Sequence, residues 1–163
     1  MNDVTVGKIA NLKPVELSYI AGFLDGDGSV MSLVEKHNEK RYKIRIRVLV
    51  EFTQHNDNII VLKYLQRKIG GGNIYRSLRN VWKYSIKAQK LVKKLLKALY
   101  PFSVLKKRQI KIALIVLSLS LDNPKGLLRA AKLSDDISKR NLRSKSRKIN
   151  GLELVKNAIS CND

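Results

Sequence analysis

Residues 20–29 read Ile20-Ala21-Gly22-Phe23-Leu24-Asp25-Gly26-Asp27-Gly28-Ser29, and our interpretation of the fold begins from this stretch. It places small and aliphatic residues in a helical pattern directly before two carboxylates that one glycine separates. The surrounding chain is strongly basic, with 33 Lys and Arg against 13 Asp and Glu. A basic chain has few reasons to keep two acids so close together. Holding a divalent metal against a nucleic-acid backbone is the best of those reasons.

The positive charge is unevenly placed along the chain. The formal net charge is +20, and the isoelectric point is about 10.2. No acidic residue lies between Asp57 and Asp122, whereas 15 Lys or Arg occur there. Ordinary solvated faces alternate in sign, so this segment indicates a continuous surface for a polyanion, DNA or RNA. An anionic membrane surface fits less well, because no basic helix carries an aromatic-rich apolar face.

Length and composition limit the class of protein. A chain of 163 residues with 44% hydrophobic residues predicts a single domain over 1–163 with a real core. The lone Cys161 excludes a disulfide framework and a cysteine-based zinc site, which fits a reducing compartment. The longest apolar run, 112–117, is too short to span a bilayer, and the first residues lack the pattern of a signal peptide. We therefore expect neither membrane insertion nor secretion.

The order of the expected elements is α-β-β-α-β-β-α, followed by a helical tail. This order predicts an α+β fold with a four-stranded antiparallel sheet, helices on one face and cations on the other. We expect the core at about 14–121 and the tail at about 122–163, with a basic loop at 141–148. Expected helices are about 14–25, 58–69, 89–99, 106–121, 125–140 and 149–160, and expected strands are about 29–37, 42–53, 73–78 and 81–87.

The second strand has the clearest alternation in the chain. Residues 44, 46, 48, 50 and 52 are apolar, and three of the five positions between 43 and 51 are cations, repeating about every 6.5–7 Å. A twisted sheet or ribbon can enter a major groove and read base edges. We therefore expect DNA contacts from the outward residues and the basic loop: Lys43, Arg45, Arg47, Glu51, Tyr75, Lys83, Ser85, Arg143 and Lys145.

The acidic stretch could also form a calcium loop or a plain turn. An EF-hand beginning at Asp25 would need Gly at Val30 and Glu at Lys36, so the calcium loop fails at its two most demanding positions. A plain Asp-Gly turn is the second alternative. The doubled Asp-Gly, the preceding helix and the basic chain favour a functional site over a structural turn.

The helix before the acids carries small residues four positions apart. Ser18, Gly22 and Gly26 therefore share one helical face, which allows another helix to approach closely. That face either packs inside one core or meets a copy of itself. The second arrangement predicts a homodimer with two Asp27 carboxylates side by side at the interface, enough for a two-metal site.

These residues resemble the nonapeptide motif of the LAGLIDADG homing endonucleases. Residues 20–28 match it identically at five of nine positions, three others are aliphatic or aromatic exchanges, and Gly26 stands where the motif has alanine. The single motif in a short chain resembles the homodimeric branch of the family. The resemblance covers nearly the whole chain, although the nonapeptide and the two basic segments carry its specificity.

The resemblance implies roles for particular residues. Asp27 matches the family's metal-binding carboxylate, and the carbonyl of Gly26 would be a further ligand. Gln54 matches the polar residue that organises active-site water, and Lys106 matches the lysine near the scissile phosphate.

One position departs from the family's pattern. Relatives often carry a basic residue four positions after this glutamine, and here Asn58 stands there. Arg108 is a candidate replacement for that cation.

The implied activity is site-specific, Mg²⁺-dependent cleavage of a long pseudo-palindromic DNA site, with staggered cuts and short 3′ overhangs. The expected location is a chloroplast, a mitochondrion or a prokaryotic cytoplasm. An RNA-splicing cofactor of the same fold, a maturase, is the alternative, with RNA as its partner. A non-catalytic basic nucleic-acid-binding protein is a third hypothesis, and it leaves the doubled acid without a role.

Overall fold

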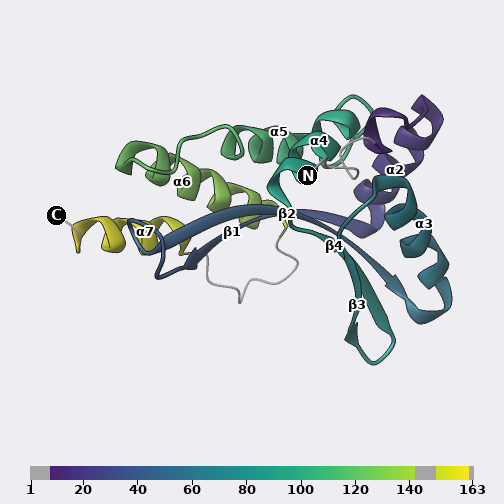
Figure 1. The fold of residues 1–163 in the computed structure, drawn as a ribbon, viewed down its shortest axis with the longest axis horizontal. Coiled ribbons are helices and arrows are strands. Elements are labelled where there is room, and N and C mark those ends of the chain that lie inside the picture. The colour runs from purple at the N-terminus through teal and green to yellow at the C-terminus, as the bar shows by residue number, and fades with distance from the viewer. Residues whose placement is uncertain (1–7, 142–149, 162–163) are drawn as a thin grey trace.

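The computed structural model describes residues 8–141 and 150–161. The α+β fold expected from the sequence is confirmed (Figure 1). The strands are β1 (Gly28–Lys36), β2 (Ile44–His55), β3 (Asn73–Leu78) and β4 (Val81–Ile86). The helices are α2 (Pro14–Asp27), α3 (Ile59–Ile69), α4 (Gln89–Leu99), α5 (Lys107–Val116), α6 (Pro124–Arg140) and α7 (Gly151–Ser160), and a 3-10 turn, Asn56–Asn58, precedes α3.

The four strands form one antiparallel sheet in the order β1-β2-β4-β3. The expected inward residues of β2, from Ile44 to Phe52, are at most 6% exposed, because they face the helices. In Figure 1 the helices lie over one face of the sheet and at its ends, and no described helix covers the opposite, outer face. Buried hydrophobic residues from Ile9 to Val155 form one continuous cluster between these layers.

The helices obey the expected periodicity. In α4, for example, lysines alternate with the buried positions, so one face packs on β2 while the other faces solvent. The buried positions of α4 are Leu91, Val92, Leu95, Leu96 and Leu99.

The helix before the acids is longer than the expected 14–25, and the acidic stretch does not form the plain Asp-Gly turn of the second alternative. Helix α2 continues through Asp27, and β1 begins at once with Gly28, whose backbone is extended. Gly26 is therefore helical. A Cβ on Gly28 would approach the Leu24 backbone to 2.8 Å, which explains why glycine occupies the junction.

Two other boundaries also differ from expectation. Helix α3 begins one residue later than the expected 58, with Asn58 at the cap position, while Asp57 lies in the 3-10 turn and pairs with His55 Nδ1 at 3.1 Å. Helix α5 is shorter than expected because the chain turns after Val116. The glycine run after α3 agrees with expectation, since residues 70–72 all have positive φ angles of 72° to 115°.

The helical tail docks on the first strand. Ser134 Oγ of α6 lies 2.6 Å from Ser32 Oγ, and Asn141 Nδ2 donates to the Val30 carbonyl at 2.6 Å. Asp135 then accepts the first amides of α7, from Gly151 at 3.0 Å and Leu152 at 2.9 Å. The end of α6 is thereby held beside the start of β1.

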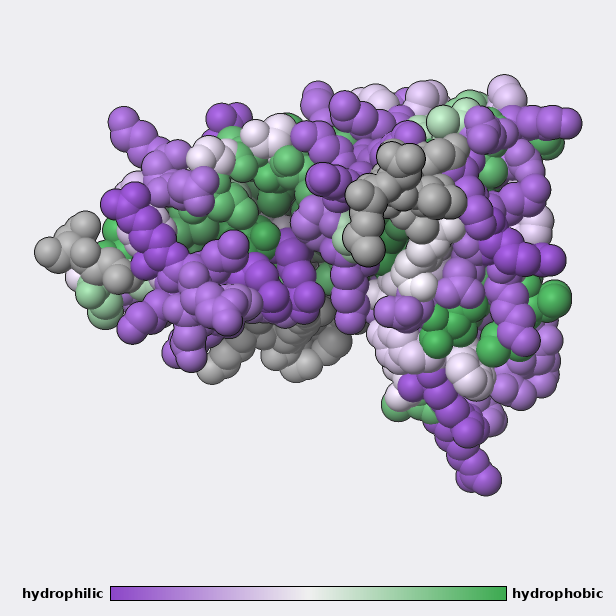
Figure 2. Space-filling model, in the orientation of Figure 1, coloured by the Kyte–Doolittle hydropathy of each residue, from purple (hydrophilic) through white to green (hydrophobic). Residues whose placement is uncertain are grey.

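Hydrophilic side chains cover most of the face drawn in Figure 2 and project from its edges, while hydrophobic ones surface over α5 and α6 and beside α3. Among the described residues, no helix is long and apolar enough to cross a membrane.

Candidate active site and nucleic-acid surface

Three residues proposed as catalytic meet at one end of the sheet. Gln54 Nε2, near the end of β2, donates to Asp27 Oδ2 at 2.7 Å. The Nζ of Lys106 donates to the main-chain carbonyl of Asp25 at 3.0 Å, so this ammonium is held at the last turn of α2. The three residues come from segments 27 to 79 positions apart along the chain, and only the fold brings them together.

Asp25 fixes the loop that carries Lys106. Its Oδ1 accepts from Ser103 Oγ at 2.5 Å and from the Lys106 amide at 3.0 Å. Its Oδ2 accepts from the amides of Val104 at 2.6 Å and Leu105 at 3.0 Å. Partial burial alone raises the pKa of Asp25, but these four hydrogen bonds outweigh it and hold the pKa below its usual range. The two acids therefore have different tasks: Asp25 positions a loop, and Asp27 is exposed.

Asp27 and Lys106 line a hollow of about 390 Å³. Two of its polar side chains were not predicted from the sequence, namely Gln109 of α5 and Arg140 at the end of α6. No sequence pattern around Arg140 indicates a role at this site, because over a hundred residues separate it from Asp27 along the chain. The remaining lining residues are Gly28, Ser29, Thr53 and Asn141.

The suggested replacement for the missing cation is not supported. Arg108 lines a different hollow, with Tyr100 and Asp136, and it does not line the hollow around Asp27. Asn58 is exposed at the start of α3 and does not line the Asp27 hollow either.

The small-residue row of α2 does not pack inside the core. Ser18, Gly22 and Gly26 are exposed, and a Cβ on either glycine would meet no atom within 4 Å. Large apolar side chains are exposed in the same helix, in α3 and in the loop before α5, namely Val15 (72%), Tyr19 (48%), Ile60 (64%), Val104 (80%) and Leu105 (73%). The first alternative for this row, packing within one chain, is therefore wrong.

Two of the expected base-reading arginines are paired with an acid that was not predicted from the sequence. The carboxylate of Glu35 in β1 accepts hydrogen bonds from Nη2 of Arg45 at 3.1 Å and from Nη2 of Arg47 at 3.0 Å. Burial raises the pKa of Glu35, and the two guanidinium groups lower it further than burial raises it, to a value below the usual range. The strand register places Glu35 directly opposite Arg45, so counting positions from the hairpin would have found the pair. Both arginine Nε atoms are buried and have no hydrogen-bond partner in the described chain.

A second cluster on the outer face surrounds Glu51. Its carboxylate accepts from Tyr75 OH at 2.9 Å and from Lys83 Nζ at 3.3 Å. Burial and the bond to Glu51 raise the pKa of Tyr75. Ser85 lies across the strand from Glu51, on the outer side of the sheet as expected, but it is only 3% exposed, and its Oγ has no partner among the described residues.

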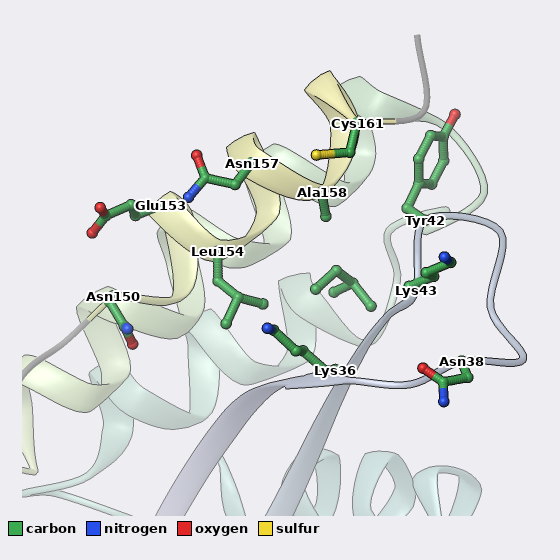
Figure 3. A pocket seen from close by; sticks show the side chains of 11 residues that line it. Lys36, Asn38, Tyr42, Lys43, Asn150, Glu153, Leu154, Asn157, Ala158 and Cys161 are labelled. Atoms are coloured by element: carbon green, nitrogen blue, oxygen red, sulfur yellow. The ribbon is translucent and has the colours of Figure 1, made fainter.

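Lys43 is not part of the row of cations on β2. Its φ of 51° places it in the left-handed region, one residue before the strand begins. It lines a separate hollow of about 450 Å³ between the hairpin tip and α7, and Figure 3 shows Lys36 and Lys43 on one side, with Glu153 and Asn157 of α7 on the other. Arg143 and Lys145 lie outside the described residues.

A metal site at Asp27 needs ligands beyond those that the described residues of one chain provide. Among the described residues, no three His, Cys, Asp or Glu side chains form a group that would hold a metal ion. Asp27 is nevertheless exposed, and its carboxylate is a hard oxygen donor of the kind that Mg²⁺ prefers. A second Asp27 and phosphate oxygens of a nucleic acid are donors of the same kind, so the residues fit a shared site.

Comparisons with known proteins agree with this geometry. Residues 20–116 match the family described as LAGLIDADG endonuclease. The DNA endonuclease I-CreI of Chlamydomonas reinhardtii is 30% identical over 135 residues, which cover 81% of this chain and 82% of that protein. The DNA endonuclease I-CvuI of Chlorella vulgaris is 22% identical over 125 residues, covering 76% and 78%.

Solved structures share the fold. A structure of I-CvuI with DNA in the presence of Mg gives a TM-score of 0.82 at 22% identity, covering 91% of this chain and 94% of that one. A structure of I-CvuI with its target and Ca gives 0.79 at 23% identity, covering 90% and 92%. The archaeal intron-encoded endonuclease I-Vdi141I with DNA gives 0.74 at 22% identity, covering 90% and 98%.

Proposed function

The chain belongs to the LAGLIDADG endonuclease family, and from that premise we propose that it cuts double-stranded DNA at a specific site by metal-dependent hydrolysis, with staggered cuts in the two strands. The observation that carries the proposal is the hydrogen bond of 2.7 Å from Gln54 to Asp27, together with the hollow that Asp27 and Lys106 line. A carboxylate can hold a metal, an amide can orient a water, and an ammonium can stabilise the negative charge of a phosphodiester under attack.

Each of these side chains has a distinct task in the proposed reaction. Asp27 and the Gly26 carbonyl hold the metal, for which we propose Mg²⁺. Gln54 donates one amide hydrogen to Asp27, and its carbonyl orients the attacking water. Lys106 places its ammonium beside the scissile phosphate, where it stabilises the negative charge of the transition state. When bound, the metal supplies an activated water and stabilises the attacking and leaving oxygens.

We propose that the active form is a homodimer joined through α2. The exposed row of Ser18, Gly22 and Gly26 lets two α2 helices approach closely, and the exposed Val15 and Tyr19 gain burial there. Asp27 is also exposed and lies one residue beyond Gly26, so a two-fold axis at this row brings two carboxylates together. That arrangement supplies a second acid, which the described residues of one chain do not place beside Asp27.

The outer face of the sheet then contacts the DNA. Arg45 and Arg47 are each paired with Glu35 at 3.0 to 3.1 Å, and these partly exposed pairs are weak enough to exchange for base edges or phosphates. Lys83 is paired with the more buried Glu51 at 3.3 Å. The Nε atoms of both arginines are buried without a hydrogen-bond partner, so a guanidinium that leaves Glu35 for the DNA can also give its Nε a partner. Replacing these ion pairs by contacts to base edges would give preference for particular bases, and little free energy is lost when such a weak pair breaks.

One experiment tests the proposal directly. The protein is incubated with a library of randomised DNA duplexes, with and without Mg²⁺, and the new ends are sequenced. We expect cuts only with Mg²⁺, in one pseudo-palindromic sequence, with short 3′ overhangs. Binding without cuts in any sequence, or equal binding of structured RNA with no DNA cleavage, would contradict the proposal and favour a role in RNA splicing.

A further inference from the structure

We propose that Arg140 supplies the second cation at the scissile phosphate. Asn58 stands where relatives often carry a basic residue, and its side chain is uncharged. The proposal rests on the proposed function, and it names an additional catalytic residue of the same site. Arg140, Asp27 and Lys106 line one hollow, whereas Asn58 and Arg108 do not line it.

Residues before and after Arg140 in the sequence make contacts that hold the end of α6 at this hollow. Asn141 donates to the Val30 carbonyl of β1 at 2.6 Å, three residues after Asp27. About two turns earlier, Ser134 contacts Ser32 at 2.6 Å in the core. These contacts fix the last turns of α6, and with them the backbone of Arg140, against β1.

The guanidinium is available to a phosphate. It pairs with Asp136, one turn back on α6, at 3.2 Å, with the two side chains 29% and 38% exposed. An ion pair of this kind on a helix surface is weak and screened by salt. Asp136 also lines the neighbouring hollow with Lys107, Arg108 and Lys111, so it keeps positive neighbours when Arg140 turns away. A guanidinium has two parallel donors that match phosphate oxygens, and it remains charged at every working pH.

The charges in the hollow support this role. Lys106 reaches it from the loop that Asp25 holds, and Arg140 reaches it from the end of α6. A phosphodiester between Lys106 and Arg140 would contact cations from two different segments, and Asp27 would hold the metal beside it. Such preorganised charge lowers the barrier because it needs no rearrangement when the phosphorane-like transition state forms.

The test compares single-turnover cleavage of the duplex recovered from the library by four variants. Arg140→Gln keeps the length and removes the charge, and Arg140→Lys keeps the charge without the fork. Asp136→Asn removes only the ion pair. Lys132→Gln is the matched control, since it removes an exposed cation of α6 that does not line the hollow. The dissociation constant is measured without added metal, and thermal melting reports folding.

We expect Arg140→Gln to cut about 100-fold more slowly at saturating protein, with an unchanged melting temperature and a dissociation constant within about threefold of wild type. Arg140→Lys should be intermediate, and Asp136→Asn and Lys132→Gln should stay within about threefold in rate. Cleavage by Arg140→Gln at the wild-type rate overturns the inference alone. An equal loss in Asp136→Asn, or a loss confined to affinity, overturns it as well. A wild-type protein that cuts no duplex refutes the proposed function and the inference with it.

Discussion

Replacing Asp25 by Asn should destabilise the protein in a pH-dependent way. The carboxylate accepts four hydrogen bonds, two at each oxygen. Asparagine keeps one accepting oxygen and turns an NH₂ group toward two donors. A net hydrogen bond contributes about 1 kcal/mol, more at a charged acceptor, and this group is partly exposed, so we expect a loss of about 2–3 kcal/mol at pH 7. For a chain of this size the melting temperature should fall by about 5–10 °C.

The sign of the pH dependence follows from the lowered pKa of Asp25. Its contribution to stability is fully present above the pKa in the unfolded chain, about 3.9, and is lost as the pH falls through the lower folded value. Urea unfolding of wild type and variant from pH 7 to pH 3 should therefore show a difference that narrows below about pH 4. Asp57→Asn is the control: its side chain is 79% exposed, and it should change stability by less than about 0.5 kcal/mol. A difference independent of pH, or an equal effect in the control, would refute the assignment of Asp25 as the anchor of the loop.

Four further outcomes are expected. Asp27→Asn should abolish cleavage and leave DNA binding largely intact, because this carboxylate is a proposed metal ligand; near wild-type cleavage in Mg²⁺ would exclude that role. Gly22→Leu should separate the two α2 helices and abolish both dimer and activity, and sedimentation that shows a fully active monomer would end the dimer proposal. With about 10 phosphates neutralised, log K against log salt should have a slope of about −9, and a slope shallower than about −3 would mean that most cations face away from the DNA. Arg47→Ala should cost about 1–3 kcal/mol and relax preference at one base pair in each half-site, whereas a uniform loss over all sequences would make Arg47 a phosphate contact only.

The periodic elements were predictable because their signals are local. The alternation of residues 44–52 fixed which face of β2 is buried, and residues 70–72 fixed the end of α3. The motif at 20–28 led to the family, and Gln54 and Lys106 were found through that resemblance rather than through their own neighbours. The expected end of this helix near residue 25 was wrong: α2 continues through Asp27, and β1 begins at once with Gly28.

The sequence by itself determined the order of the elements, the inward and outward faces of β2, and the presence of two acids at the end of α2. These properties depend on residues within a few positions of one another, where backbone geometry sets the spacing. Only the tertiary structure decided that Asp25 holds a loop 78 to 81 residues away, that Glu35 pairs with both arginines, and that Arg140 lies in the hollow with Asp27. Such contacts depend on how separate elements pack, and a local sequence pattern does not show which distant side chains will lie beside it.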